Sequence, residues 1–311
     1  MCILANAEKH TSNSVLSAIH NPHQVTLTGT WHILRNGIQF LEPEIEILPY
    51  LKMRKVEKLS VFELAGLGAK GFTQWALIEP FSYRKNLFEI ISSENDAKVG
   101  YDVLNRAWLL NTLLVLRRHT RINSIALLNR SWTNIKDIDK DFAVEANLCD
   151  YHVKMLTLNG FDKPAVDEDD INWISKHFEL ANILANKNEK FKYALTVTNT
   201  WRYCVDLRSA IAIIWAAIES IVDVSTEITY RLSLSLSSLL RDRGDLRLQK
   251  FNEIKTLYKL RSKVIHGSEI KTADATAALS GSVNLLSELI CYMIENDRLV
   301  TEDDFKSAIF H

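Results

Sequence analysis

The chain has 311 residues, of which 47% are apolar and 24% charged, and its 37 Lys and Arg nearly balance its 38 Asp and Glu. This composition is typical of a folded globular protein and excludes a disordered, collagenous or disulfide-stapled chain. A net charge of −1 excludes a protein that is basic over its whole surface, but it allows a local basic face. The length is typical of two domains, each with its own core.

The first part of the chain carries strand and turn signals. Alternating apolar and polar residues predict a strand over 25–33 and another over 44–47. Asn36-Gly37 lies between HILR and IQFL, and it predicts a two-residue hairpin turn because both residue types tolerate positive φ. Further strands are expected over 59–64 and 75–78, and a helix over 105–118.

The second part of the chain is expected to be helical. No proline follows Pro164, and glycine occurs afterwards only at Gly244, Gly267 and Gly281. This scarcity of helix breakers favours helices, and the acidic cluster at 167–170 would cap the first one. Helices are expected over 171–186, 190–198, from 206 onward, and over 226–240, 245–266 and 272–296. We therefore expect an α+β protein, with a mixed α/β domain and small sheet in residues 1–165 and an all-α bundle in residues 166–311.

Nothing in the sequence indicates export, a membrane or a bound metal. The N-terminus lacks the basic start and apolar run of a signal peptide. The longest apolar run, 210–218, is less than half of the roughly 20 residues that span a membrane. His20, His23 and His32 lie near one another in sequence without metal-ligand spacing, so we expect no metal and no cofactor. A cytoplasmic protein with free thiols is expected.

The segment 244–267 predicts a helix in which Arg261 falls within an apolar stripe. Arginine is rarely buried alone, so Arg261 must pair with an acid, reach a cleft or face another chain. His266 occupies the last helical position before Gly267, a common helix-ending residue. Arg261 and His266 are five residues apart, about 140° around the axis, so they converge only if the last turn unwinds or two such helices meet. The stripe consists of Phe251, Ile254, Leu257, Tyr258, Val264 and Ile265.

The hexapeptide RSKVIH, from Arg261 to His266, resembles the R-x4-H signature of HEPN domains. Its surroundings resemble the Apea-like branch of that family over about residues 170–296, through the ordered strings AIIWAAIESIV, TYRLSLSLSSLL and FNEIKTLYKLRSKVIHG. The resemblance implies a helical bundle that dimerises and cleaves RNA without a metal, as in toxins and antiviral nucleases. His266 would then take a proton from a ribose 2′-OH, and Arg261 would stabilise the charge on the phosphate.

Other residues have supporting roles. Glu219 interrupts an apolar run, and it could either support Arg261 or His266 at the site or hold two helices together by an ion pair. Ser262 stands where nucleolytic members of the family often have Asn, Asp or His, and it can still donate a hydrogen bond. This substitution keeps open the alternative of a non-catalytic HEPN module for RNA binding or dimerisation, or a toxin–antitoxin subunit.

Local charge favours RNA as a partner. Residues 231–271 carry ten Lys and Arg against four acids, which gives +6. Arg231, Lys259 and Lys263 are candidate RNA contacts, because phosphate contacts dominate nucleic-acid affinity. The alternatives are a solvated charged face and, for Arg231, a cap on a helix pair. The other expected partners are a second copy of the chain and an antitoxin or trigger protein, with the N-terminal domain as accessory or sensor.

Overall fold

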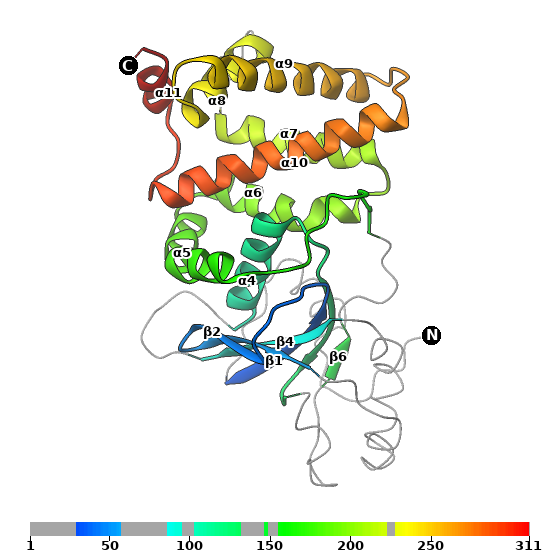
Figure 1. Cartoon of the computed structure of the whole chain (residues 1–311), viewed down its shortest axis with the longest axis vertical. Coiled ribbons are helices and arrows are strands. Elements are labelled where there is room, and N and C mark those ends of the chain that lie inside the picture. The colour runs from blue at the N-terminus through cyan, green and yellow to red at the C-terminus, as the bar shows by residue number, and fades with distance from the viewer. Residues whose placement is uncertain are drawn as a thin grey trace. The chain divides into compact units, whose positions relative to one another are not determined.

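The computed structural model describes residues 29–56, 86–94, 103–131, 146–148, 155–222 and 228–310, and its fold is α+β, as predicted (Figure 1). The chain divides into two compact units. Unit 1 comprises Met1–Val153 and Asp162–Ser175, and unit 2 comprises Lys154–Phe161 and Lys176–His311. The strands expected over 59–64 and 75–78 lie outside the described residues.

The sheet of unit 1 has the strand order β2-β3-β4-β1-β5-β6, and every described pairing is antiparallel. Strands β2 and β3 form a hairpin around Pro49 and Tyr50. The predicted strand over 44–47 is confirmed as β2. The strands are β1 (Thr30–Asn36), β2 (Glu44–Leu48), β3 (Leu51–Lys55), β4 (Leu87–Ser93), β5 (Asn123–Leu128) and β6 (Ala146–Leu148).

Helix α4 (Val103–Arg118), predicted over 105–118, lies against β1 and β4 and is buried along most of its length. A buried arginine joins the sheet to this helix. Arg35 of β1 donates from Nη1 to Oδ1 of Asn111 at 2.9 Å and to Oγ of Ser124 at 2.6 Å. Because a buried guanidinium needs hydrogen-bond acceptors, these bonds fix α4 on the sheet.

The hairpin predicted at Asn36-Gly37 is wrong. Strand β1 pairs with β4 and β5 instead of with the residues that follow it, and Gln39 forms an isolated bridge with Ala165. Gly37 has φ +126°, and a Cβ there would lie 1.9 Å from the carbonyl oxygen of Arg121. This glycine therefore permits the close approach of two backbone segments, which a turn signal alone does not distinguish from a hairpin.

Unit 2 is a helical bundle, and all six helices predicted for this part of the chain are present. The first begins three residues earlier than expected, at Glu168, where Oδ1 of Asp167 accepts a hydrogen bond from the N–H of Asp170 at 3.0 Å. A further helix, α11, was not predicted. The helices are α5 (Glu168–Lys187, which begins in unit 1), α6 (Glu189–Thr200), the 3-10 helix Trp201–Tyr203, α7 (Leu207–Val222), α8 (Ile228–Leu240), α9 (Asp245–Ile265), α10 (Thr272–Glu295) and α11 (Glu302–Phe310).

Helices α7 and α10 form the centre of unit 2, and α9 packs on both. The buried Trp215 of α7 donates from Nε1 to Oγ of Ser282 on α10 at 2.9 Å. Its ring meets Tyr258 of α9 edge-on, with 5.2 Å between ring centres. A Cβ on Gly281 of α10 would lie 2.7 Å from Leu257 of α9, so the glycine allows these two helices to approach closely. The core therefore fixes the position of α9.

Among the described helices, α10 has the length and mean hydropathy, 1.4, of a membrane-spanning segment. In the structure, 61% of its apolar window is buried. A core helix in a bundle meets the same criteria of length and composition.

Candidate functional site

The R-x4-H motif lies at the C-terminal end of α9, where the helix stops as the sequence predicts. His266 is the C-cap residue, and Gly267 adopts the left-handed conformation with φ +73°. The N–H of Ser268 donates to the carbonyl of Lys263 at 3.0 Å, which is the pattern of a glycine-terminated helix. The apolar stripe predicted for this helix is mostly buried, but Ile265 is an exception and is 43% exposed.

Arg208 of α7 also stabilises this end of α9, and the sequence analysis missed it. Its Nη1 donates to the carbonyl of Val264 at 3.2 Å, and its Nη2 donates to the carbonyl of Ser268 at 3.0 Å. A cation favours the negative end of a helix, so Arg208 holds the motif against α7. Its acceptors are 56 and 60 residues away in sequence, so no local sequence pattern predicts the contact.

Arg261 faces α7 and pairs with Glu219, the predicted carboxylate partner. Its Nη2 lies 3.1 Å from Oε1 and 3.2 Å from Oε2 of Glu219. The two side chains are 21% and 27% exposed, so the pair lies at the edge of the core. The guanidinium also lies over the ring of Tyr258, 5.3 Å from its centre. These contacts hold the guanidinium in one position, although its buried Nε has no hydrogen-bond partner.

Tyr258 connects the ion pair to the core of the bundle. Burial raises the pKa of its phenol, and the nearby charge of Glu219 raises it further, whereas Arg261 acts in the opposite direction. The phenol is therefore neutral at physiological pH. Glu219 is held by Arg261, and its charge acts on the neighbouring phenol of Tyr258.

His266 is exposed, and its imidazole makes no hydrogen bond or ion pair with any other residue that the structure describes. The backbone N–H of His266 donates to the carbonyl of Ser262 at 3.0 Å, which keeps the backbone of His266 close to the helical path. A separation of five residues from Arg261 then corresponds to about 140° around the axis. Within one chain, the structure brings Arg261 to Glu219 but brings neither of them to His266.

Lysines follow the side of α9 opposite Arg261. Lys259 and Lys263 are exposed, and Lys255 is half-buried with its Nζ 5.6 Å from the ring centre of Phe251. Successive lysines are four residues apart, so the three span an arc of about 80°. We call Lys255, Lys259 and Lys263 the lysine face. It leads along α9 towards His266.

Four other basic residues between 231 and 271 make structural contacts. Arg241 and Lys250 both pair with Glu288 of α10, the lysine at 2.9 Å. Arg243 and Arg247 donate to main-chain oxygens in the last turn of α11, at 3.1 and 3.0 Å. These contacts fasten the turn between α8 and α9 to the rest of the bundle. The excess of positive charge available to a ligand is therefore concentrated on the C-terminal part of α9.

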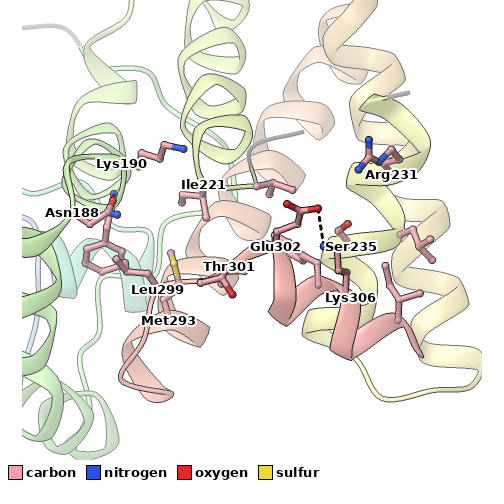
Figure 2. Close-up of a pocket in the computed structure, with 16 residues that line it drawn as sticks. Asn188, Lys190, Ile221, Arg231, Ser235, Met293, Leu299, Thr301, Glu302 and Lys306 are labelled. Atoms are coloured by element: carbon pink, nitrogen blue, oxygen red, sulfur yellow. Dashed lines mark hydrogen bonds and ion pairs between the residues drawn. The ribbon is translucent and has the colours of Figure 1, made fainter. Parts of the chain in front are cut away.

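Arg231 does not join the lysine face. It lies exposed on α8, where it lines a pocket together with residues of α6, α7, α10 and α11 (Figure 2). None of the described residues that line this pocket belongs to α9. The pocket therefore includes Arg231 but neither Lys259 nor Lys263, with which it was grouped by charge.

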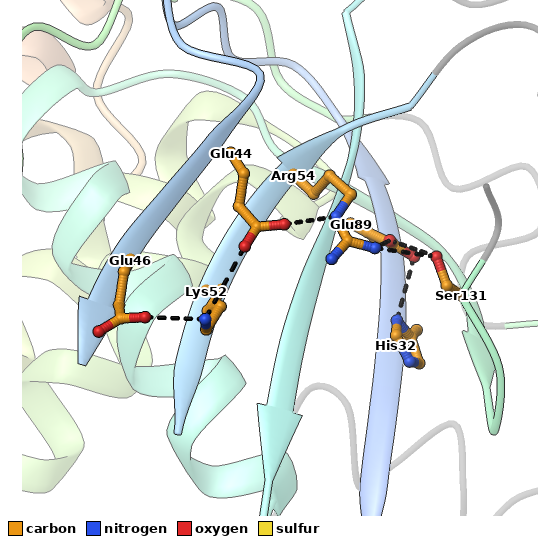
Figure 3. Close-up of polar contacts among 7 residues, drawn as sticks. All are labelled: His32, Glu44, Glu46, Lys52, Arg54, Glu89 and Ser131. Atoms are coloured by element: carbon orange, nitrogen blue, oxygen red, sulfur yellow. Dashed lines mark hydrogen bonds and ion pairs between the residues drawn. The ribbon is translucent and has the colours of Figure 1, made fainter. Parts of the chain in front are cut away.

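A second polar cluster, also missed by the sequence analysis, lies on the sheet of unit 1 (Figure 3). The carboxylate of Glu89 on β4 is fully buried, with Oε2 3.2 Å from Nδ1 of His32 on β1, and Oε1 accepts from Ser131 at 2.7 Å. Arg54 of β3 lies opposite Glu89, with Nη1 3.4 Å from Oε1, and its Nε donates to Glu44 at 2.6 Å. Strand register brings these residues together from distant parts of the chain.

A carboxylate that holds one ring nitrogen of a histidine, as Glu89 holds His32, is an arrangement found in general bases and in metal ligands. Within the part of the chain that the structure describes, no three potential metal-ligating side chains come together. His20 and His23, which were considered together with His32, lie outside that part. The burial of Cys204 raises the pKa of its thiol, which makes it a poor nucleophile.

Comparison with protein-family models, curated proteins and solved structures found no match to this chain. The likeness to HEPN domains therefore rests on the motif and the strings around it.

Proposed function

We propose that the protein is a metal-independent endoribonuclease and that the end of α9 carries its reacting groups. The observation that carries this proposal is His266: an exposed imidazole without a partner among the described residues, at the end of the lysine face. Lysines supply affinity for the phosphates of RNA, and imidazole is the side chain best suited to move protons near neutral pH. The R-x4-H likeness of residues 261–266 supports the same assignment.

In the proposed reaction, neutral His266 takes the proton from a ribose 2′-OH, and that oxygen attacks the adjacent phosphorus. The bond from phosphorus to the 5′ oxygen breaks, and this oxygen takes up a proton. The products are a 2′,3′-cyclic phosphate and a 5′-hydroxyl. Arg261, held in place by Glu219, stabilises the charge on the phosphoryl oxygens. DNA is inert in this scheme because it has no 2′-OH.

A second copy of the chain completes the proposed site. Arg261 and His266 point about 140° apart on one helix, so one α9 does not present both to the same phosphate. Two α9 helices that meet across a two-fold axis place Arg261 of one copy near His266 of the other. Such a homodimer through the HEPN-like bundle forms one composite cleft, with a lysine face leading to it from each side.

Unit 1 then has an accessory role, in which it senses a trigger or restrains cleavage. A trigger protein or an antitoxin is the corresponding partner, in the cytoplasm. The resemblance to toxin and antiviral HEPN proteins is the support for this part of the proposal.

A non-catalytic HEPN module, for RNA binding or dimerisation or as a toxin–antitoxin subunit, is the second candidate. The observation that favours it is the Arg261–Glu219 pair, because an arginine committed to a carboxylate serves to join α7 and α9 without any ligand. Ser262, in place of the Asn, Asp or His of nucleolytic members, favours it too. In this case the lysine face would still bind RNA.

The test uses the purified full chain with a labelled single-stranded RNA, alongside an otherwise identical strand in which every ribose is 2′-deoxy. We expect the RNA to be cut and the deoxy strand to remain intact, with equal rates with and without EDTA. His266→Ala should slow cutting by about 100-fold or more, whereas Lys176→Ala, at an exposed position on α5, should not. Undiminished cutting by His266→Ala would refute the mechanism. RNA binding without any cutting by the wild type would establish the non-catalytic module.

A further inference from the structure

Unit 2 contains a pocket of about 530 Å³ that lies apart from the motif at the end of α9 (Figure 2). Its volume is in the range of small-molecule sites, about 300–1,000 Å³. The walls come from α6, α7, α8, α10 and α11. Apolar side chains form much of the lining, among them Phe191, Ile221, Leu234, Met293, Phe305 and Ile309.

One hydroxyl that faces this pocket lacks a protein partner among the described residues. Ser235 of α8 is only 8% exposed, and its side chain makes no hydrogen bond with any residue that the structure describes. By contrast, the hydroxyls of Ser233 and Ser237 on the same helix donate to main-chain carbonyls at 2.6 and 3.1 Å. A hydroxyl without a protein partner in a largely apolar pocket is available to a ligand. A ligand atom that accepts its hydrogen bond would gain this contact.

The charges around Ser235 favour an anion. Arg231 lies one helical turn before it on the same side of α8, and Figure 2 shows Lys190 on the opposite wall of the pocket. Lys306 also lines the pocket, where its Nζ is 3.2 Å from Oε1 of Glu302. The described lining thus carries three cations and one carboxylate.

We propose that this pocket binds a small amphipathic carboxylate. Its carboxylate accepts hydrogen bonds from Ser235 and Arg231, and its aliphatic body lies over Phe191, Met293 and Phe305. The mixed lining is what selects this class: an inorganic anion leaves the apolar wall uncovered, and a neutral hydrocarbon leaves Ser235 unpaired. The site does not depend on RNA cleavage, so its test stands apart from that of the proposed nuclease.

Decanoate and its uncharged counterpart decanol are suitable probes for calorimetric titration of the full chain. We expect decanoate to bind at least about tenfold more tightly than decanol, because one charge-assisted hydrogen bond contributes about that factor. Ser235→Ala and Arg231→Gln should each weaken decanoate binding about five- to twentyfold and affect decanol binding less, because the alcohol carries no charge. Lys271→Gln, which removes an exposed cation outside the pocket, is the matched control and should have no effect.

Ser235→Ala removes only the unsatisfied hydroxyl, so its melting temperature should equal or exceed that of the wild type. If this variant keeps its melting temperature, weaker binding cannot be attributed to a loss of folding. The proposal fails if no decanoate binds at about 1 mM, which corresponds to the weakest affinity expected of a specific site. Equal affinity for decanoate and decanol, or binding that neither variant changes, also overturns it.

Discussion

Arg261 of α9 and Glu219 of α7 form an ion pair across two helices, with Nη2 of the arginine 3.1 Å from Oε1 of the glutamate. The pair explains why a charged residue occupies each of two apolar helix faces. It also sets the orientation of the guanidinium, because Tyr258 lies against Arg261 and Glu219 together. Any role of Arg261 towards a phosphate begins from this fixed position.

Breaking the pair from either side should destabilise unit 2, because the remaining half-buried charge loses its partner. We expect Arg261→Ala and Glu219→Ala each to lower the free energy of unfolding by about 1–2 kcal/mol. The double variant should lose less than the sum, by about 0.5–1 kcal/mol. Urea unfolding of the wild type and the three variants measures this difference. Strictly additive losses would mean that the two side chains act independently.

The lysine face should control the affinity for RNA and its salt dependence. Each of Lys255→Gln, Lys259→Gln and Lys263→Gln should reduce the slope of log affinity against log salt by about 0.7, the value for one phosphate contact on a single strand. Fluorescence anisotropy with a labelled RNA at several salt concentrations provides the slopes. Lys176→Gln is the control for the loss of one exposed charge elsewhere. Slopes that do not differ between the wild type and the three variants would exclude this face as the RNA contact.

The N-terminal cap of α7 should make unit 2 less stable in acid. Oδ1 of Asp206 accepts a hydrogen bond from the N–H of Ser209 at 2.8 Å, and chiefly this bond lowers the pKa of Asp206. A carboxyl whose pKa is lower in the folded state stabilises the fold above its unfolded pKa, about 3.9, and this stabilisation is lost as the pH falls through the folded pKa. Asp206→Ala should therefore cost about 1 kcal/mol at neutral pH and less at about pH 3. Urea midpoints at the two pH values test this, and an unchanged difference would contradict it.

Gly37 should tolerate no side chain. Gly37→Ala places a Cβ 1.9 Å from a main-chain oxygen at φ +126°, and we expect a loss of about 3 kcal/mol or more. Gly29→Ala is the matched control, because Gly29 also has positive φ, +80°, but faces open space, and its loss should be about 1 kcal/mol. Thermal unfolding of the two variants gives the comparison. Equal losses would show that the approach of the Arg121 backbone is not the cause.

The helices of unit 2 were predictable because their information is local: a 3.6-residue period, an acidic cap at Asp167 and a glycine stop at Gly267. Even α11 has a local signal, since Thr301 and Asp304 form a capping box with hydrogen bonds of 2.8 and 3.3 Å between them. The unexpected charge of Arg261 in an apolar stripe predicted an acidic partner, a cleft or a contact with another chain, and in the structure Glu219 is the acidic partner.

The sheet was less predictable because its information is not local. Strands β4 and β5 are nearly fully buried and show little alternation, so their pairing depends on partners far away in sequence. Asn36-Gly37 has the residues of a hairpin, yet the chain leaves the sheet there. The contact between His32 and Glu89 follows from strand register, and sequence spacing gives no indication of it.

Complementation between two inactive variants tests the composite site most directly. Arg261→Ala and His266→Ala should each cut RNA at least about 100-fold more slowly than the wild type. When the two are mixed and allowed to exchange subunits, half of the dimers carry one intact Arg261–His266 pair, so activity should return to about a quarter of the wild-type rate. A mixture as inactive as its components would contradict a site shared between two copies, and wild-type rates for the single variants would contradict any role for these residues in cleavage.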